Sequence, residues 1–216
     1  MSHHHHCHGE ATEHDHNHDH DHEHDAEADT GLQDSLFGKV AVDRSWCLNE
    51  TIPNSIQTVF KPWDSRHDTS HAVESDADEE LLIHVPFTGM VKLKSLFVWG
   101  GPDASAPSAL RIFANRDDLD FDNVADAEPT QELELIHGAT QVPEYPVRTA
   151  KFNSTQSLTL HVPGNFGADQ TTVYYLAFRG EWTELSETPV ISVYELKPNV
   201  ADHKTKNENL SHHSIS

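Results

Sequence analysis

The feature that constrains the fold most is a series of short apolar runs in the middle of the chain. Each run holds about five to eight residues rich in branched or aromatic side chains, and Gly, Pro, Asn or Asp bounds most of them. In one of them Leu158 and Leu160 alternate with Thr159 and His161, which is the period of a strand. We therefore predict seven or more β-strands. The runs cover residues 79–87, 91–99, 109–115, 132–136, 157–163, 172–180 and 189–196.

The order of these runs also indicates how the strands pair. No long segment repeats apolar residues at helical spacing, and strands without helices between them argue against a parallel α/β sheet. We expect the first strand to end near Pro86. The predicted fold class is all-β, an antiparallel sandwich in which each strand contributes alternate residues to a shared interior. Loops at 100–108 and 163–171, rich in Gly, Pro and Asp, would cluster at the sandwich ends, where partners commonly bind.

Composition divides the chain into three parts. Residues 1–30 contain no Lys, Arg or aromatic residue and almost no large apolar side chain, so we predict a disordered leader rich in His and Asp. Residues 200–216 are polar and aperiodic, and we predict a flexible C-terminal tail. The folded domain is expected at 31–199.

Charge and cysteine content narrow the classes of partner and compartment. The chain has 14 Lys and Arg residues and 36 Asp and Glu residues, a formal net charge of -22. This charge disfavours binding to nucleic acid and to anionic membranes. The start of the chain does not resemble a signal peptide, and no apolar run approaches the length that crosses a bilayer. The two cysteines, Cys7 and Cys47, form no CxxC pair, and we predict a buried, inert Cys47. These features favour a cytoplasmic and nuclear protein.

Several long blocks of the middle region resemble a known family. They are "CLNE" at Cys47–Glu50, "FKPW" at Phe60–Trp63, "VESDADEELLIHVPFTGMVKLKS" at Val73–Ser95 and "NFGADQTTVYYLAFRGEWTEL" at Asn165–Leu185. In this order they are similar to the PITH domain, the C-terminal proteasome-interacting domain of thioredoxin-like proteins. The resemblance spans about residues 32–197.

The resemblance implies a jelly-roll β-sandwich similar to galactose-binding domains, which agrees with the strand pattern. It also implies association with the proteasome, without catalytic residues and without a cofactor. The thioredoxin domain that precedes the PITH domain in those proteins has no counterpart here, so redox activity is not carried over. We therefore expect a non-enzymatic interaction module, an adaptor or regulator associated with the proteasome.

Two features of the folded region are candidates for partner contact. The run "ESDADEE" at residues 74–80 places Asp76, Asp78 and Glu79 where a basic partner could meet them, although it could equally be a solvated acidic edge before a strand. Trp182 could anchor a partner, pack in the core, or stack on a sugar as in a carbohydrate-binding module.

The histidine-rich leader supports a rival function. Residues two apart in an extended chain project to the same side, and neutral imidazoles are ligands for zinc, nickel and copper. The leader could therefore bind these metals weakly, and the alternative function is metal binding or buffering through it. A solubilising low-complexity tail is the simpler interpretation. The imidazoles concerned are His14, His16, His18, His20, His22 and His24.

Overall fold

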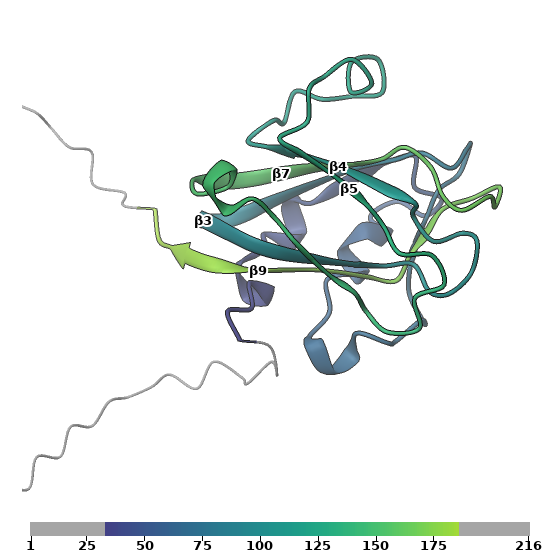
Figure 1. Cartoon of the computed structure of the whole chain (residues 1–216), viewed down its shortest axis with the longest axis horizontal. Helices are drawn as coiled ribbons and strands as arrows, with labels where there is room; N and C mark the ends of the chain where they lie inside the picture. The colour runs from purple at the N-terminus through teal and green to yellow at the C-terminus, as the bar shows by residue number, and fades with distance from the viewer. Residues whose placement is uncertain (1–32, 186–216) are drawn as a thin grey trace, which may run out of the picture. The chain divides into compact units, whose positions relative to one another are not determined.

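Nine β-strands and five short 3₁₀ helices occur in residues 33–185, the part of the chain that this computed structural model describes (Figure 1). The strands are β1 (Trp46–Leu48), β2 (Val73–Glu74), β3 (Leu81–Trp99), β4 (Ala109–Ala114), β5 (Gln131–Glu134), β6 (Glu144–Pro146), β7 (Thr155–Val162), β8 (Thr172–Val173) and β9 (Tyr175–Thr183). The helices are η1 (Phe37–Lys39), η2 (Val42–Arg44), η3 (Ser55–Thr58), η4 (Trp63–Ser65) and η5 (Thr149–Lys151). Within the same residues, no helix is long and apolar enough to pass through a membrane.

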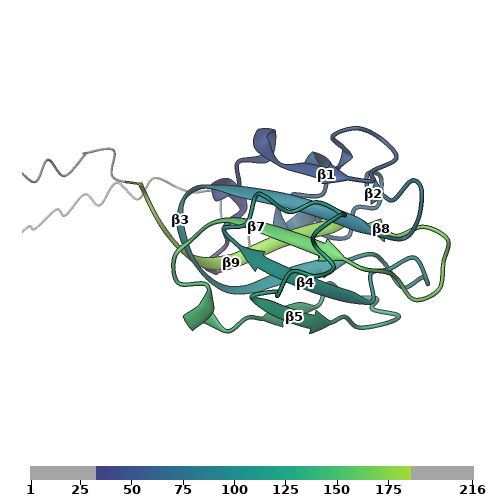
Figure 2. The same cartoon turned by 90° about the horizontal axis from the view of Figure 1, so that it is seen from above.

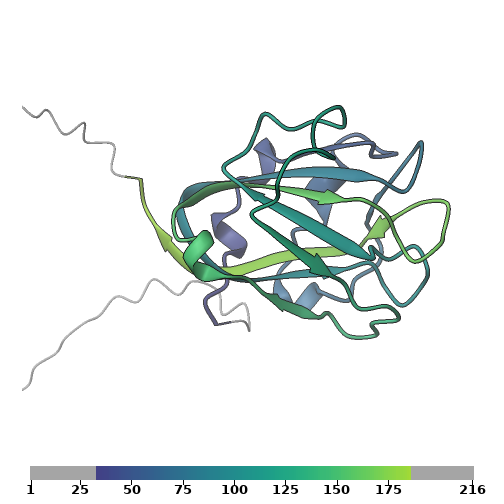
Figure 3. The ribbon, with the colours of Figure 1, turned by 45° about the horizontal axis from the view of Figure 1, so that its top comes forward.

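The 19-residue strand β3 organises the sandwich because it belongs to both layers. Its first arm, up to Pro86, pairs with β1 and β7, whereas its second arm, from Met90, pairs with β9 and β6 and meets β7 at Val91. Figures 2 and 3 show the strand curving from one layer into the other at one end of the molecule. A strand that changes sheets through a bend is one way to form the corner of a β-sandwich.

The expected end of the first strand near Pro86 is wrong, since the runs at 79–87 and 91–99 form one continuous strand. The pairing of β3 with β7 shifts register between Pro86 and Val91, so the ladder is already interrupted where proline lacks an amide hydrogen. The Pro86 carbonyl still accepts a hydrogen bond, from the Ala41 amide at 2.9 Å. Pro86 therefore lies at the bend without ending the strand.

The remaining pairing is antiparallel throughout the described residues. Strands follow the order β1-β3-β7-β4-β5 in the first layer, and β2 and β8 form a separate pair. The predicted runs at 109–115, 132–136 and 157–163 correspond to β4, β5 and β7, and the run at 172–180 corresponds to β8 and most of β9. The predicted strand at 189–196 lies outside the described residues. Strands β1, β2 and β6, of two or three residues each, were not predicted.

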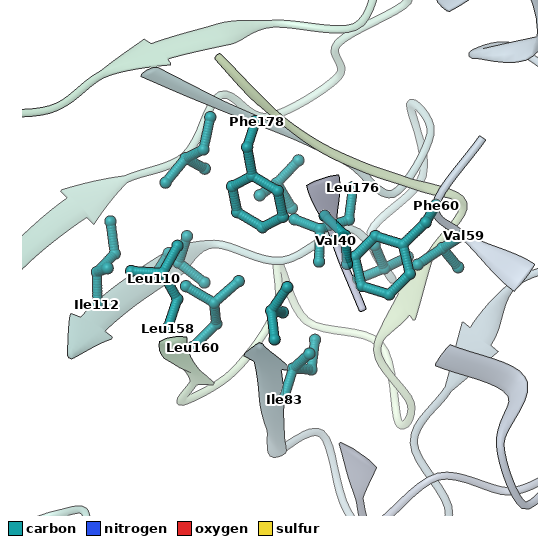
Figure 4. Packing of buried hydrophobic residues seen from close by; sticks show 14 of the residues in the cluster. Val40, Val59, Phe60, Ile83, Leu110, Ile112, Leu158, Leu160, Leu176 and Phe178 are labelled. Atoms are coloured by element: carbon teal, nitrogen blue, oxygen red, sulfur yellow. The ribbon is translucent and has the colours of Figure 1, made fainter. Parts of the chain in front are cut away.

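The main core lies between the two layers and is made by alternate residues of each strand. Figure 4 shows Leu176 and Phe178 of β9 facing Leu158 and Leu160 of β7, and all four are buried. Full burial of each such side chain contributes roughly 1.5–3 kcal/mol. This packing confirms the predicted all-β class, an antiparallel jelly-roll β-sandwich.

The predicted leader (1–30), both ends of the predicted folded domain (31–199) and the predicted tail (200–216) lie outside the described residues. They stay predictions.

Candidate functional site

Three loops meet at the end of the sandwich opposite the bend of β3. They are residues 74–80, 100–108 and 163–171, and the first of these is called the acidic loop below. Backbone hydrogen bonds join them: the Phe166 amide donates to Ala104 at 3.0 Å, and the Ser75 amide donates to Thr171 at 2.9 Å. The loops therefore form one connected surface.

Asn49, directly after β1, holds the acidic loop through side-chain hydrogen bonds. Its left-handed backbone (φ 68°) turns the side chain toward the loop. The amide nitrogen donates to Asp78 Oδ1 at 2.8 Å and to the Glu80 carbonyl at 2.7 Å. The amide oxygen accepts from the Ala77 amide at 2.9 Å. Asn49 therefore ties the acidic loop to the end of β1 by hydrogen bonds to its backbone.

The 163–171 loop also holds the acidic loop through side-chain hydrogen bonds. Gln170 Nε2 donates to the Ser75 carbonyl at 2.8 Å, and the Thr171 hydroxyl donates to the Glu79 carbonyl at 2.5 Å. The side chains of Asp76 and Glu79 are exposed. The backbone of the acidic loop is thus fixed, while the carboxylates of Asp76 and Glu79 face solvent.

The electrostatic character of this surface follows from its composition. The three loops carry seven carboxylates and no Lys, Arg or His. Such a surface raises the local concentration of cations and speeds the association of positively charged partners. The carboxylates are those of Glu74, Asp76, Asp78, Glu79, Glu80, Asp103 and Asp169.

Trp182 lies elsewhere. It pairs with Val91 just beyond the bend of β3, whereas the acidic loop precedes the first residue of that strand. The first arm of β3, about 20 Å long, separates the two ends. The structure therefore groups Asp76, Asp78 and Glu79 and leaves Trp182 apart from them.

The surroundings of Trp182 are those of a packed residue. It is half-buried against the main core, and the Lys39 ammonium lies 4.3 Å from the centroid of its ring. Its Nε1 is buried and has no hydrogen-bond partner within residues 33–185. Packing on the sandwich accounts for these contacts, and a role as a partner anchor stays a prediction.

Two buried histidines lie on the outer face of the first layer, and the sequence pattern did not predict their burial. His84 stacks on Trp46, with 5.0 Å between the ring centroids, and its Nδ1 lies 3.1 Å from the Thr159 hydroxyl. Because that hydroxyl donates to the Arg116 carbonyl, it accepts from His84, so Nδ1 carries the proton. Burial lowers the pKa of His84.

His161 lies on the same face and is 2% exposed. Its Nε2 lies 2.5 Å from Glu80 Oε1, yet burial outweighs this carboxylate and lowers the pKa of His161. Leu119 and Val124 of the loop that follows β4 pack over this face. Large apolar side chains in an acidic loop are the sequence signal that could have revealed the cover, although the third of them, Phe121, is exposed.

The register of β1 with β3 separates Cys47 from these imidazoles. Cys47 pairs with Ile83 and Trp46 pairs with His84. Successive residues of a strand face opposite sides, so the thiol faces the core and the His84 ring faces outward. Burial raises the pKa of the Cys47 thiol, in agreement with the predicted buried cysteine.

Metal ligation cannot be assigned to the folded region. Within the described residues, no group of three or more His, Cys, Asp or Glu side chains is arranged to hold a metal ion. The imidazoles at His14, His16, His18, His20, His22 and His24 lie outside the described residues. Metal binding by the leader therefore stays a prediction.

Comparisons with known proteins identify the relatives of this chain. The family model for the PITH domain matches residues 26–198. PITH domain-containing protein 1 of Homo sapiens is 43% identical over 187 residues, which cover 86% of this chain and 88% of that protein. PITH domain-containing protein CG6153 of Drosophila melanogaster is 44% identical over 179 residues, 82% of this chain and 84% of that protein. Among solved structures, the CBM32-1 and CBM32-2 domains of Clostridium perfringens ZmpB, in complex with GalNAc, give a TM-score of 0.49 at 12% identity, covering 67% of this chain and 35% of that one.

Proposed function

The chain belongs to the PITH domain family, and from this premise we propose that it is a non-enzymatic protein-interaction module associated with the proteasome. It acts as an adaptor or regulator in the cytoplasm and nucleus. The proteasome is the partner that the sequence blocks at Cys47–Glu50 and Val73–Ser95 imply, and the family match supports the interaction role in general terms.

The observation that carries the proposal is the exposure of acidic side chains on a fixed backbone. Asn49 and Thr171 hold the acidic loop through its main chain, so Asp76 and Glu79 are already presented to solvent. A preordered surface spends less conformational entropy on binding than a mobile one. Its charge selects a partner surface rich in Lys and Arg.

Co-purification with the acidic loop neutralised tests this proposal. The full-length chain carrying Asp76→Asn, Asp78→Asn and Glu79→Gln keeps the shape of each side chain and loses three charges. We expect it to recover about threefold less proteasome, or still less, by quantitative mass spectrometry at low salt. Recovery of proteasome equal to wild type would contradict the role of the acidic loop.

A control variant separates local contact from net charge. It removes three exposed carboxylates from other parts of the sandwich and should recover proteasome as wild type does. A further chain without residues 1–30 discriminates the rival function, since an adaptor keeps its partner and a metal buffer loses its capacity. The control substitutions are Asp126→Asn, Glu132→Gln and Glu134→Gln.

A further inference from the structure

A groove beside the acidic loop has the features of a peptide-binding site. It opens between residues 52–58 and 69–74, has a volume of about 380 Å³, and is also lined by Tyr174. Its size falls within the range of small-ligand sites, roughly 300–1,000 Å³. Glu74 lines the groove and also begins the acidic loop, so the two surfaces are continuous.

The wall formed by residues 52–58 is braced by a carboxylate that faces into the protein. Glu50 accepts from the Asn54 amide at 2.5 Å, from the Ser55 hydroxyl at 3.0 Å and from the Ile56 amide at 3.1 Å. These bonds tie the carboxylate to the start of η3. The first wall therefore has a set conformation without a ligand.

The wall formed by residues 69–74 is braced by a buried ammonium group. Lys61 donates to the Asp68 carbonyl at 2.6 Å and to the His71 carbonyl at 3.0 Å. The Asp68 carboxylate in turn accepts from the Ser70 amide at 2.9 Å. Both walls are thus preformed, which lowers the entropy cost of binding.

The exposed side chains at the opening of the groove indicate which kind of ligand it binds. Ile52 is 65% exposed, the largest value among the exposed large apolar side chains of residues 33–185. Pro53 beside it is exposed as well, and the exposed Glu74 supplies a carboxylate. Neither Lys nor Arg lines the groove. An exposed isoleucine next to a carboxylate complements a ligand that presents an apolar group beside a cation.

We infer that this groove binds an extended peptide segment of a partner protein in which an apolar side chain neighbours Lys or Arg. The apolar side chain packs on Ile52 and Pro53, and the cation lies against Glu74 and the acidic loop. This inference rests on the proposed function and specifies the chemistry of the partner. It requires no covalent step.

The test uses the isotope-labelled full-length chain and a synthetic octapeptide with a central leucine-arginine pair and glycine-serine flanks. A leucine-glutamate peptide and an alanine-alanine peptide are the controls. We expect the leucine-arginine peptide to shift the amide signals of residues 52–58 and 69–74 in NMR titration. The leucine-glutamate peptide should leave them unchanged, because its carboxylate meets Glu74.

Matched variants assign the contacts. Ile52→Ser and Glu74→Gln should each weaken the binding of the leucine-arginine peptide about fivefold or more. Ile136→Ser removes an isoleucine that is 57% exposed on another loop, and Glu132→Gln removes an exposed carboxylate of β5. Both should bind the peptide as wild type does. Unchanged signals outside the groove verify that each variant is folded.

Two results would overturn the inference. One is the absence of shifts in the groove at millimolar leucine-arginine peptide. The other is binding that Ile52→Ser leaves unchanged. Recovery of the proteasome by the wild-type chain is measured separately, so loss of the groove inference with intact recovery leaves the proposed function standing. Failure of recovery would instead remove the proposed function.

Discussion

Replacing Asn49 with glycine should loosen the acidic loop without straining the backbone. Asn49 has φ 68°, a conformation that glycine adopts freely. The substitution deletes the amide that bonds Asp78 Oδ1, the Glu80 carbonyl and the Ala77 amide at 2.7–2.9 Å. The acidic loop would keep its contact with Thr171 and the main-chain bond from the Asp76 amide to the carbonyl of residue 49, and would lose only the bonds made by the Asn49 side chain.

The magnitude follows from these three bonds. Each contributes roughly 0.5–1.5 kcal/mol net, and partial exposure favours the lower half of that range. The free energy of unfolding should therefore fall by about 2 kcal/mol for Asn49→Gly. Asn49→Ala loses the same bonds and adds about 1 kcal/mol for a left-handed residue with a Cβ, so about 3 kcal/mol is expected.

Urea unfolding and hydrogen exchange measure the two consequences. The Ala77 amide donates a hydrogen bond to Asn49 Oδ1 in the native loop, so its hydrogen should exchange faster in both variants. Asn54→Gly is the control, because Asn54 has φ 65° and its side chain caps no helix end. It should change the unfolding free energy by less than about 0.5 kcal/mol. Wild-type stability and unchanged Ala77 exchange in Asn49→Gly would show that the Asn49 side chain does not hold the acidic loop.

Three further predictions concern the buried groups. Burial holds the pKa of His84 and His161 below the ordinary 6.5, so the unfolded chain binds protons more readily than the folded chain. The free energy of unfolding should therefore fall below about pH 6.5, by up to about 1.4 kcal/mol per pH unit for each histidine. Urea unfolding at several pH values measures this, and a flat profile would contradict it. Gly180→Ala would place a Cβ too close to a backbone carbonyl of β3 and should cost about 2 kcal/mol in thermal unfolding, whereas Gly38→Ala, which meets open space, should leave the melting temperature unchanged. Burial raises the pKa of the Cys47 thiol, so in a Cys7→Ser variant, where Cys47 is the one thiol of the chain, thiol-reagent labelling should be slow in the native protein and accelerate with denaturant; rapid native labelling of that variant would contradict the burial of Cys47.

The fold was largely predictable from local pattern, and the exception shows where pattern fails. Alternation in Leu158 and Leu160 predicted β7, and both side chains reach the core. Pro86 was expected to end a strand, because its missing amide hydrogen normally interrupts a ladder. The strand continues because the ladder with β7 is already broken by a register shift at that point. That shift depends on the partner strand, which lies far away in the sequence.

The candidate site was predictable in part for a similar reason. Asp76 and Glu79 belong to one short run, so the sequence alone placed them together. Trp182 was the other candidate for a partner contact, but its position near the bend is set by the pairing of β9 with the second arm of β3. The burial of His161 depends on Leu119 and Val124 of a separate loop. Neither the position of Trp182 nor the burial of His161 can be predicted from the spacing of neighbouring residues in the sequence.

Direct binding of purified proteasome to the full-length chain over a range of salt concentrations tests the central claim. We expect saturable binding that weakens as salt rises, with a shallower salt dependence when Asp76, Asp78 and Glu79 are neutralised. The control variant with three other neutralised carboxylates should match wild type. No saturable binding at low salt, or equal affinity and equal salt dependence for all three proteins, would contradict it.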